Sequence, residues 1–302
     1  MMKLIVLGSC PANPTQSKFT TSQVLQDNES SYLIDCGEST QIQLRQNKIK
    51  FNSIENIFIS HLHGDHYFGL PGLISTFNLL GREKPVNIYG PKGLKEIIIT
   101  IMKLGKTWTN FKLNFRILAS LSPEVIIDNK KFSVTTIPMK HRIYNNGFLF
   151  RKKTFQYTLR LNKVLSYGID KTQYSGIKLG KNGISQSGHV IKNIELVEPL
   201  KPDKTYAFCS DTAFNPEIID QITGCDLLYH ESTFLKKHED LASKTSHSTA
   251  EQAATIAKKS NAKKLILGHF SNRYKNLDLF IDEAKPIFKN VYLATQNKTF
   301  SI

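Results

Sequence analysis

The chain has 302 residues, of which 40% are apolar and 22% charged, the composition of an ordinary globular protein with a sizeable core. Forty Lys and Arg against 25 Asp and Glu leave a net charge of +15, which favours nucleic acid as partner over a membrane surface or an acidic small molecule. No apolar run approaches the ~20 residues of a membrane span, and the run at residues 4–7 is too short for a signal sequence. We therefore expect a cytoplasmic protein without a membrane segment.

Strand-like and helix-like segments alternate along the chain, and none of the four cysteines forms a Cys-x-x-Cys pair. The spacing predicts helices at 39–46, 69–80, 93–102 and 249–259, the last with Ser248 as its N-cap. The alternation predicts an α/β fold in a single domain spanning residues 1–302, with reduced thiols. Apolar runs predict strands at 3–7, 22–26, 31–34, 54–59, 86–89, 131–137, 205–209, 227–229, 264–267 and 291–294.

Residues 145–195 differ from the rest of the chain. They hold nine Lys and Arg but only two acidic residues, Asp170 and Glu195, and they contain no Pro and few long apolar runs. We interpret this segment as an inserted arm rather than part of the core, although a basic surface hairpin without a role remains the alternative. Its first cations are Arg151, Lys152 and Lys153.

Four ligand-type side chains lie within six positions, in the run His61-Leu62-His63-Gly64-Asp65-His66. The run directly follows the predicted strand 54–59, so the side chains sit on a turn at the end of a strand. Imidazole and carboxylate groups suit Zn²⁺, which takes ligands at about 2.0–2.2 Å. We expect the small Gly64 to permit the irregular backbone that brings these side chains together.

This H-x-H-x-D-H run resembles the signature of the metallo-β-lactamase superfamily. His141 after an Ile-Pro turn, Asp211 in Cys-Ser-Asp-Thr and His269 in Gly-His-Phe-Ser fall where that family carries its later motifs. The resemblance implies a four-layer αββα sandwich and two zinc ions, a clamp about 3.5–4 Å across that suits phosphoesters. It implies that His61, His63 and His141 hold one ion, that Asp65, His66 and His269 hold the other, and that Asp211 bridges both.

The expected nucleophile is a hydroxide that bridges the two metal ions, formed because bound metal lowers the pKa of water to near neutrality. Asp65 is expected to orient this hydroxide through its second carboxylate oxygen.

Further segments at 60–73, 230–234, 246–249 and 268–274 resemble ribonuclease Z, the tRNA 3′-processing endonuclease. The resemblance implies that His247 contacts the scissile phosphate and donates the leaving-group proton, that Glu231 orients His247, and that Arg273 binds phosphate. It also implies that the basic segment is a tRNA-gripping arm, or exosite, that includes Arg151, Lys152 and Lys153. A homodimer is expected, in which the arm of one subunit holds the tRNA precursor cut by the other.

Two segments depart from the ribonuclease Z pattern. In the N-terminal loop, Gln16, Lys18 and Phe19 stand where the family has Lys, Arg and Asn. That loop bears on handling of the tRNA 3′ end, so Lys18 is a candidate substrate-binding residue and the cleavage position is left open. In the arm, Tyr174-Ser175-Gly176 stands roughly where the family often has a Gly-Pro motif.

The leading hypothesis is a zinc-dependent endoribonuclease that removes the 3′ trailer from tRNA precursors. The alternative is a metallo-phosphodiesterase acting on small phosphodiesters with the same metal site. A non-enzymatic RNA-binding module is a further possibility, against which the intact set of seven ligands argues. Hydrolysis of a thioester or lactone is less favoured by the His247 and Glu231 motifs, and Mn²⁺ or Co²⁺ are alternatives to zinc.

Overall fold

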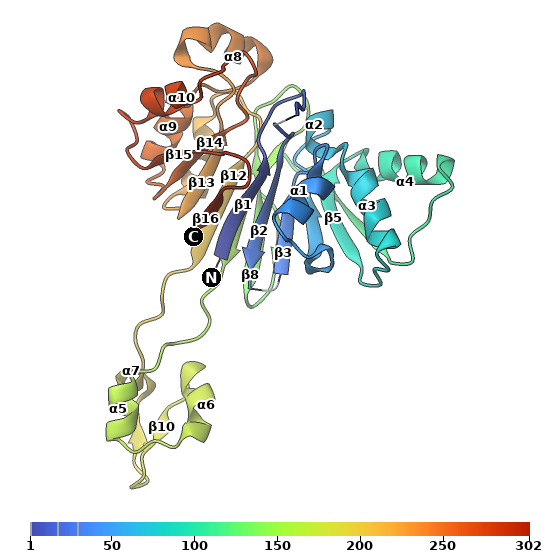
Figure 1. Ribbon diagram of the computed structural model, residues 1–302. Coiled ribbons are helices and arrows are strands. Elements are labelled where there is room, and N and C mark those ends of the chain that lie inside the picture. Colours follow the sequence, from blue (N-terminus) through green and yellow to red (C-terminus); the bar gives the residue numbers. More distant parts are fainter. Residues whose placement is uncertain (1, 17, 29) are drawn as a thin grey trace. The chain divides into compact units, whose positions relative to one another are not determined.

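Two seven-stranded sheets organise the chain, which the computed structural model describes at residues 2–16, 18–28 and 30–302. Across the first sheet the strands are β16 (Thr299–Ser301), β1 (Met2–Gly8), β2 (Ser22–Asp27), β3 (Ser30–Ile34), β4 (Ile54–Phe58), β5 (Val86–Pro91) and β6 (Leu113–Leu118). The strands from β16 to β3 pair antiparallel, whereas β3, β4, β5 and β6 run parallel. The strands nearest the two chain ends, β1 and β16, are therefore neighbours (Figure 1).

The second sheet contains the strands that carry most of the later motifs. Its strands, in order, are β15 (Val291–Leu293), β14 (Leu265–Gly268), β13 (Leu227–Glu231), β12 (Lys204–Cys209), β9 (Asn146–Lys152), β8 (Phe132–Pro138) and β7 (Val125–Asp128). The strands from β12 to β15 are parallel. Parallel strands need crossover connections, and helices provide several of them.

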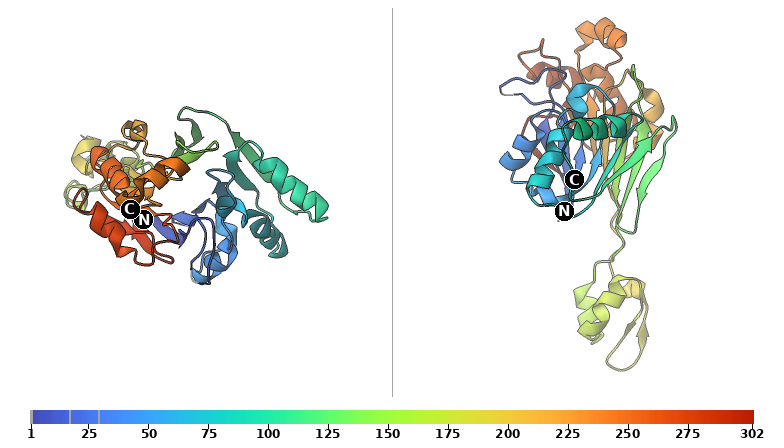
Figure 2. Two further views of the ribbon diagram at one scale, coloured as in Figure 1. Left: turned by 90° about the horizontal axis from the view of Figure 1, so that it is seen from above. Right: turned by 90° about the vertical axis from the view of Figure 1, so that its right-hand side faces the viewer.

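Helices cover the outer face of each sheet (Figures 1 and 2). The first sheet is covered by α1 (Thr40–Gln46), α3 (Leu70–Leu79) and α4 (Leu94–Leu104), and the second by α9 (Ala250–Lys259) and α10 (Asp278–Ala284). The short α2 (Gly64–Tyr67) and α8 (Glu239–Thr245) lie in connections, with 3₁₀ turns at Phe51–Ser53, Pro216–Ile218, Asp220–Ile222 and Lys236–His238. This is the predicted four-layer αββα arrangement, and that prediction is confirmed. No helix in the described part of the chain is both long and apolar enough to cross a bilayer.

Aromatic side chains fill the space between the two sheets. Phe58 of β4 packs edge-on against Phe150 and tilted against Phe148, both on β9, with ring centroids 5.2 and 5.4 Å apart. Phe150 stacks in turn on Tyr206 of β12, whose buried hydroxyl donates a hydrogen bond to Gln23 of β2. Such aromatic pairs stabilise the fold by about 0.5–1.5 kcal/mol each beyond their buried area. The four cysteines are buried and unpaired, as expected.

A second compact unit is formed by Ile127–Val134 and Arg151–Lys204. It contains α5 (Leu161–Ser166), a 3₁₀ turn at Lys171–Gln173, α6 (Tyr174–Lys178), the hairpin β10 (Gly183–Ile184) and β11 (Val190–Ile191), and α7 (Asn193–Leu196). These elements enclose a small apolar core of Leu159, Val164, Ile169, Ile177, Leu196 and Val197. Thirteen Lys and Arg against five Asp and Glu give the unit a net charge of +8, more than half of the chain's +15.

The unit's bounds differ from the range 145–195 at both ends. Asn146 to Phe150 belong to β9 and are buried, because Phe148 and Phe150 supply part of the core between the sheets. At the other end, residues up to Lys204 belong to the second unit. The basic side chains of this segment begin only after Phe150. The composition averaged over residues 145–195 therefore did not reveal that its first residues belong to an apolar strand of the core.

Each predicted strand and helix overlaps one in the structure, but two local predictions are wrong. The N-cap of α9 is Thr249 rather than Ser248, because Thr249 forms a capping box with Gln252. Gly64 does not permit an irregular backbone, since it begins the regular turn α2. A Cβ at this position would meet the ring of Phe68, which is 56% exposed and would have to shift.

Candidate metal centre and active site

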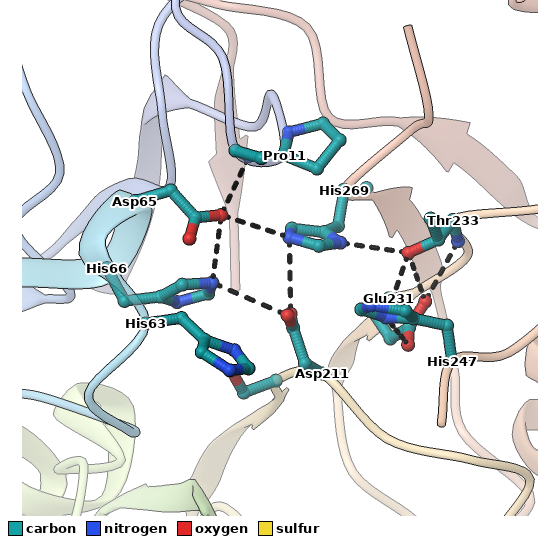
Figure 3. Close-up of polar contacts among 12 residues, drawn as sticks. Pro11, His63, Asp65, His66, Asp211, Glu231, Thr233, His247 and His269 are labelled. Carbon is teal, nitrogen blue, oxygen red and sulfur yellow. Dashed lines mark hydrogen bonds and ion pairs between the residues drawn. The ribbon is translucent and has the colours of Figure 1, made fainter. Parts of the chain in front are cut away.

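The seven predicted metal ligands come from segments that directly follow strands. His61 and His63 lie between β4 and α2, and His141 follows β8 after Pro138. Asp211 and His269 come directly after β12 and β14, and their own side chains are buried. The structure brings all seven together at one edge of the two sheets: His61, His63, Asp65, His66, His141, Asp211 and His269. Figure 3 labels His63, Asp65, His66, Asp211 and His269 among them.

The first cluster joins three imidazoles and a carboxylate. His63 Nδ1 lies 3.0 Å from His61 Nε2 and 3.2 Å from His141 Nε2, and His61 Nε2 lies 3.7 Å from Asp211 Oδ2. Four tetrahedral ligands at about 2.0–2.1 Å from a zinc ion are about 3.4 Å from one another, so these spacings suit a small cation.

The second cluster joins Asp65, His66 and His269 around the other side of Asp211. Asp65 Oδ2 lies 3.4 Å from His66 Nε2 and 3.5 Å from His269 Nε2. Asp211 reaches the same two nitrogens at 3.6 and 3.4 Å, one through each of its carboxylate oxygens. Both Nε2 atoms are buried and have no hydrogen-bond partner among the described residues. Buried, unpartnered nitrogens facing two carboxylates fit a bound divalent metal ion.

Hydrogen bonds behind the imidazoles fix which nitrogen faces the cluster. His66 Nδ1 donates to Asp35 Oδ2 at 2.7 Å, and His141 Nδ1 donates to the Ser246 carbonyl at 2.9 Å. His269 Nδ1 donates to Thr233 Oγ1 at 2.9 Å. Each bond engages Nδ1 and turns Nε2 toward the cluster, as metal-binding histidines require.

These three supporting residues were given no role in the sequence-based predictions. Asp35 and Ser246 have backbone φ angles of 55° and 57°, and His269 itself has a φ of 61°. The left-handed region costs a residue with a side chain roughly 1–2 kcal/mol, so its use here is consistent with a functional constraint. An Asp at the end of a predicted buried strand, such as Asp35, was the one signal available from the sequence.

The electrostatics of the cluster favour a cation. Burial, reinforced by the neighbouring imidazoles, lowers the pKa of His61 and His63, so both rings are neutral and keep a lone pair. Burial also opposes charge on His66, but nearby carboxylates, Asp65 foremost, raise its pKa well above the usual value, so a bound metal ion would displace the proton that these carboxylates hold on the ring. Burial alone would raise the pKa of Asp211, yet the charges of His269 and His66 hold it well below its usual range. Buried carboxylates that stay ionised in this way attract a metal ion.

Buried Glu231 and partly buried His247 form a pair beside the cluster (Figure 3). Glu231 Oε1 accepts from His247 Nδ1 at 2.8 Å and from the main-chain N–H groups of Thr212 and Ser248, both at 3.1 Å. Its Oε2 accepts from the N–H and the hydroxyl of Thr233, both at 2.8 Å. Burial lowers the pKa of His247, but the charge and hydrogen bond of Glu231 outweigh that effect and raise the pKa to about 9.

Comparison with known proteins supports this geometry. A family model described as Anti-Pycsar protein Apyc1 matches residues 2–196, and one described as a beta-lactamase superfamily domain matches residues 184–270. Ribonuclease Z from Bacteroides thetaiotaomicron is 42% identical over 300 residues, covering 99% of this chain and 95% of the relative. Ribonuclease Z from Cytophaga hutchinsonii is 43% identical over 301 residues, with 99% and 96% covered.

The chain belongs to the ribonuclease Z family. The crystal structure of the short form of human tRNase Z agrees, with a TM-score of 0.71, 27% identity and 99% of each chain covered. Membership confirms the predicted metallo-β-lactamase fold and an enzyme of the ribonuclease Z type.

The candidate metal centre of this ribonuclease Z family member opens into a cavity of about 460 Å³. Its wall includes His63, Asp65, Asp211, His247 and His269, together with Arg142 and the loop of residues 11–14. Ala12 N of that loop donates to Asp65 Oδ2 at 2.9 Å, so the loop contacts a candidate ligand directly.

The predicted substrate-binding cations lie elsewhere. Arg273 stacks on the ring of Phe234 at 5.2 Å and its Nε contacts Ser271 Oγ, and it is not among the described residues that line the cavity. Lys18 lines a separate hollow of about 170 Å³ beside Phe19 and Phe270.

The three arm cations belong to the second unit, where carboxylates pair with Arg151 and Lys153. Arg151 Nη1 lies 3.7 Å from Asp203, and Lys153 contacts Asp128. Lys152 is half-buried in the same strand as Arg151, β9. An RNA phosphate would therefore compete with a carboxylate for Arg151 and for Lys153.

Proposed function

We propose that the chain is an endoribonuclease that hydrolyses a phosphodiester to remove the 3′ trailer from tRNA precursors. The observation that carries this proposal is the Glu231–His247 pair beside a seven-ligand cluster, in a chain whose full-length relatives are ribonuclease Z. A phosphodiester hydrolase needs a cationic site for the reacting phosphate and a donor for the leaving oxygen. The two clusters and His247 supply groups suited to both needs.

We propose two Zn²⁺ ions as the cofactor. His61, His63 and His141 would hold one ion, Asp65, His66 and His269 the other, and the two oxygens of Asp211 face both sets. Two ions held there would supply Lewis acidity, which lowers the pKa of a water nucleophile and stabilises negative charge on the attacked phosphate. Asp65 has a main-chain N–H and two imidazoles around its Oδ2, and it would help to orient the nucleophile.

The protein's own groups would handle the leaving proton. Glu231 accepts from His247 Nδ1 and favours the doubly protonated ring. The Nε2–H group is then free to donate its proton to the leaving oxygen. Glu231 would act as a positioning residue, since five hydrogen bonds from the surrounding chain hold its carboxylate. Thr233 joins this pair to His269, so the proton donor and one candidate ligand share a support.

The direct test uses a tRNA precursor with a 3′ trailer. We expect a single cut at the 3′ end of the tRNA body, mapped by primer extension or end-labelling, with much higher kcat/KM than for bis(p-nitrophenyl) phosphate. Higher efficiency on the small diester would instead favour the alternative, a metallo-phosphodiesterase for small substrates. The net charge of +8 on the second unit supports RNA, since a small diester has no use for it.

We also propose a homodimer, located in the cytoplasm where tRNA precursors are matured. Exposed apolar side chains on and after α4 support an interface, because Leu104 and Trp108 are 78% and 72% exposed. Sedimentation of the purified chain measures its mass in solution.

The second unit is proposed as the tRNA-gripping arm, and deleting it is a testable change. Thr154 N donates to Asp203 at 2.8 Å, so the two ends of residues 155–201 lie together and a short Gly-Ser linker can replace them. Lys and Arg that neutralise phosphates release counterions, so we expect weaker tRNA binding and a flatter salt dependence. The slope should fall by about 0.7–0.9 log units per lost contact.

A charge variant of the full chain serves as the control for folding. Lys163, Lys178, Lys181 and Lys192 have no carboxylate within ion-pair distance among the described residues, so their replacement by Ala breaks no ion pair. The quadruple variant should reproduce part of the loss. Hydrolysis of bis(p-nitrophenyl) phosphate should persist in both proteins, because every proposed ligand lies in the first unit. Unchanged tRNA cleavage would make the arm a passive surface feature, and loss of both activities would place it in the folded core.

A further inference from the structure

Arg142 stands between two hollows of the first unit. It follows the candidate ligand His141 and lines the metal cavity together with His63 and His247. It also lines a neighbouring hollow of about 320 Å³, whose other walls include Leu121, Ile143 and Tyr144. Among the described residues, Arg142 is the one that the linings of both hollows share. A chain-like substrate that leaves the metal cavity on this side must pass its guanidinium.

The side chain of Arg142 is available for a ligand. It is exposed and has no ion pair or hydrogen bond within the part of the chain that the structure describes. Lys140, two residues earlier, is paired with Glu217 at 2.7 Å, and Arg273 stacks on Phe234. A planar guanidinium binds a phosphate through two parallel hydrogen bonds, which gives Arg142 a natural anionic partner.

The hollow beyond Arg142 has an apolar, firmly held wall. Leu121 and Ile143 are 82% and 39% exposed, which leaves apolar surface uncovered beside a cation. The Tyr144 hydroxyl donates to the Ser120 carbonyl at 3.1 Å and accepts from Asn146 Nδ2 at 2.8 Å, so its ring is fixed. Phosphate-binding cations next to aromatic and apolar side chains are the usual surroundings of single-stranded nucleic acid, whose bases have apolar faces.

We propose that Arg142 and this hollow form a subsite for the nucleotide next to the scissile bond. Arg142 binds the phosphate adjacent to the reacting one, and the wall of Leu121, Ile143 and Tyr144 contacts the base. The subsite rests on the proposed RNA-cleaving function, because a small diester has no second phosphate to offer Arg142. The subsite would hold the RNA next to the scissile phosphate, in addition to the contacts proposed for the arm.

The test compares Arg142→Ala, Arg142→Lys and the control Lys140→Ala on two substrates, a tRNA precursor with a 3′ trailer and bis(p-nitrophenyl) phosphate. We expect Arg142→Ala to lower the ratio of the two kcat/KM values by about 10- to 100-fold, the effect of a charged hydrogen bond. Arg142→Lys keeps the charge but loses the planar fork, so its ratio should lie between those of Arg142→Ala and the wild type. Lys140→Ala should keep the wild-type ratio.

A second variant examines the apolar wall without touching Arg142. Leu121→Glu places a negative charge beside the proposed phosphate path at a position that is 82% exposed, so it should fold normally and lower the ratio several-fold. A wild-type ratio in both Arg142→Ala and Leu121→Glu would overturn the subsite. An equal loss on both substrates in Arg142→Ala would also overturn it, since Arg142 would then serve the reacting phosphate or the metal centre. If the wild type cleaved only the small diester, the proposed function would fail, and the subsite with it.

Discussion

Asp211→Asn should remove nearly all activity and most of the bound metal. The two oxygens of Asp211 face both ligand clusters, so the substitution removes a negative charge that both proposed ions would share and replaces one ligand oxygen by an NH₂ group that cannot coordinate. Metal ions that stabilise charge in a transition state contribute several kcal/mol, which is a rate factor on the order of 10³ or more. His63→Ala should act similarly, because His63 Nδ1 lies within 3.2 Å of two other candidate ligand atoms. The measurements are metal content per chain and kcat/KM on both substrates.

A matched control separates the loss of metal from the loss of a buried charge. Asp226→Asn changes another buried carboxylate, one that accepts from Thr205 N at 2.9 Å and pairs with Lys263 at 2.8 Å, outside both clusters. This variant should keep its metal and turnover even if its Tm falls. Near-normal turnover in Asp211→Asn or His63→Ala, with the control behaving as expected, would refute the two-metal assignment.

The candidate ligands were predictable because much of their pattern is local. Four of them lie within six residues after a strand, and ligand spacing of that kind is visible without a structure. His141, Asp211 and His269 were found only through the resemblance to a family, since a single His or Asp after a strand has many structural uses. The structure adds what joins them, a common edge of two sheets that the topology creates.

The supporting residues were not predictable for a physical reason. Asp35, Thr233 and the Ser246 carbonyl act through hydrogen bonds to residues 31, 36 and 105 positions away. Two of these three residues also have left-handed backbones, and propensity alone does not place Asp or Ser in that region at a given position. Only the tertiary fold decides which carbonyl or carboxylate meets which imidazole.

The cap of α9 shows the same limit at short range. Ser248 and Thr249 are both residue types that are favoured at the N-cap, so the local sequence does not decide which of them caps α9. In the fold, Ser248 Oγ donates to the Thr212 carbonyl at 2.7 Å, and its N–H is held by Glu231. Thr249 is therefore left to cap the helix, with Gln252 completing the box. A contact 36 residues away thus settles a choice between neighbours.

His247→Ala should lower kcat on the tRNA precursor by about 10²–10⁴-fold while changing tRNA binding much less. A proton donor acts in the transition state, so its removal affects turnover rather than the ground-state complex. The tRNA Kd, measured separately by filter binding, should stay within a few-fold of the wild type. If only KM changes, His247 is a binding residue and another group donates the proton to the leaving oxygen.

Glu231→Gln should move the alkaline limb of the kcat profile to lower pH. Burial opposes the charge on His247, and Glu231 overcomes this to raise its pKa to about 9, above the 6.5 expected when unfolded. The pair's contribution to stability is therefore complete below about pH 6.5 and is lost as pH rises through about 9. A donor must be protonated, so activity should fall over that upper range, somewhat earlier once bound metal ions add their positive charge. Removing the carboxylate charge lowers the His247 pKa, so His247 loses its proton, and activity falls, at a lower pH than in the wild type.

The carboxamide introduced by Glu231→Gln has only one oxygen, so its NH₂ group meets hydrogen-bond donors that a carboxylate oxygen accepted before. A stability loss of about 1–3 kcal/mol is therefore expected as well. Thermal unfolding, followed by far-ultraviolet circular dichroism, gives the temperature range in which the variant stays folded. Within that range, a loss of folded protein lowers kcat equally at every pH, whereas a lowered His247 pKa shifts the limb itself. His247→Ala should lack the limb altogether. An alkaline limb that is the same in the wild type, Glu231→Gln and His247→Ala would show that the leaving-group proton does not come from His247.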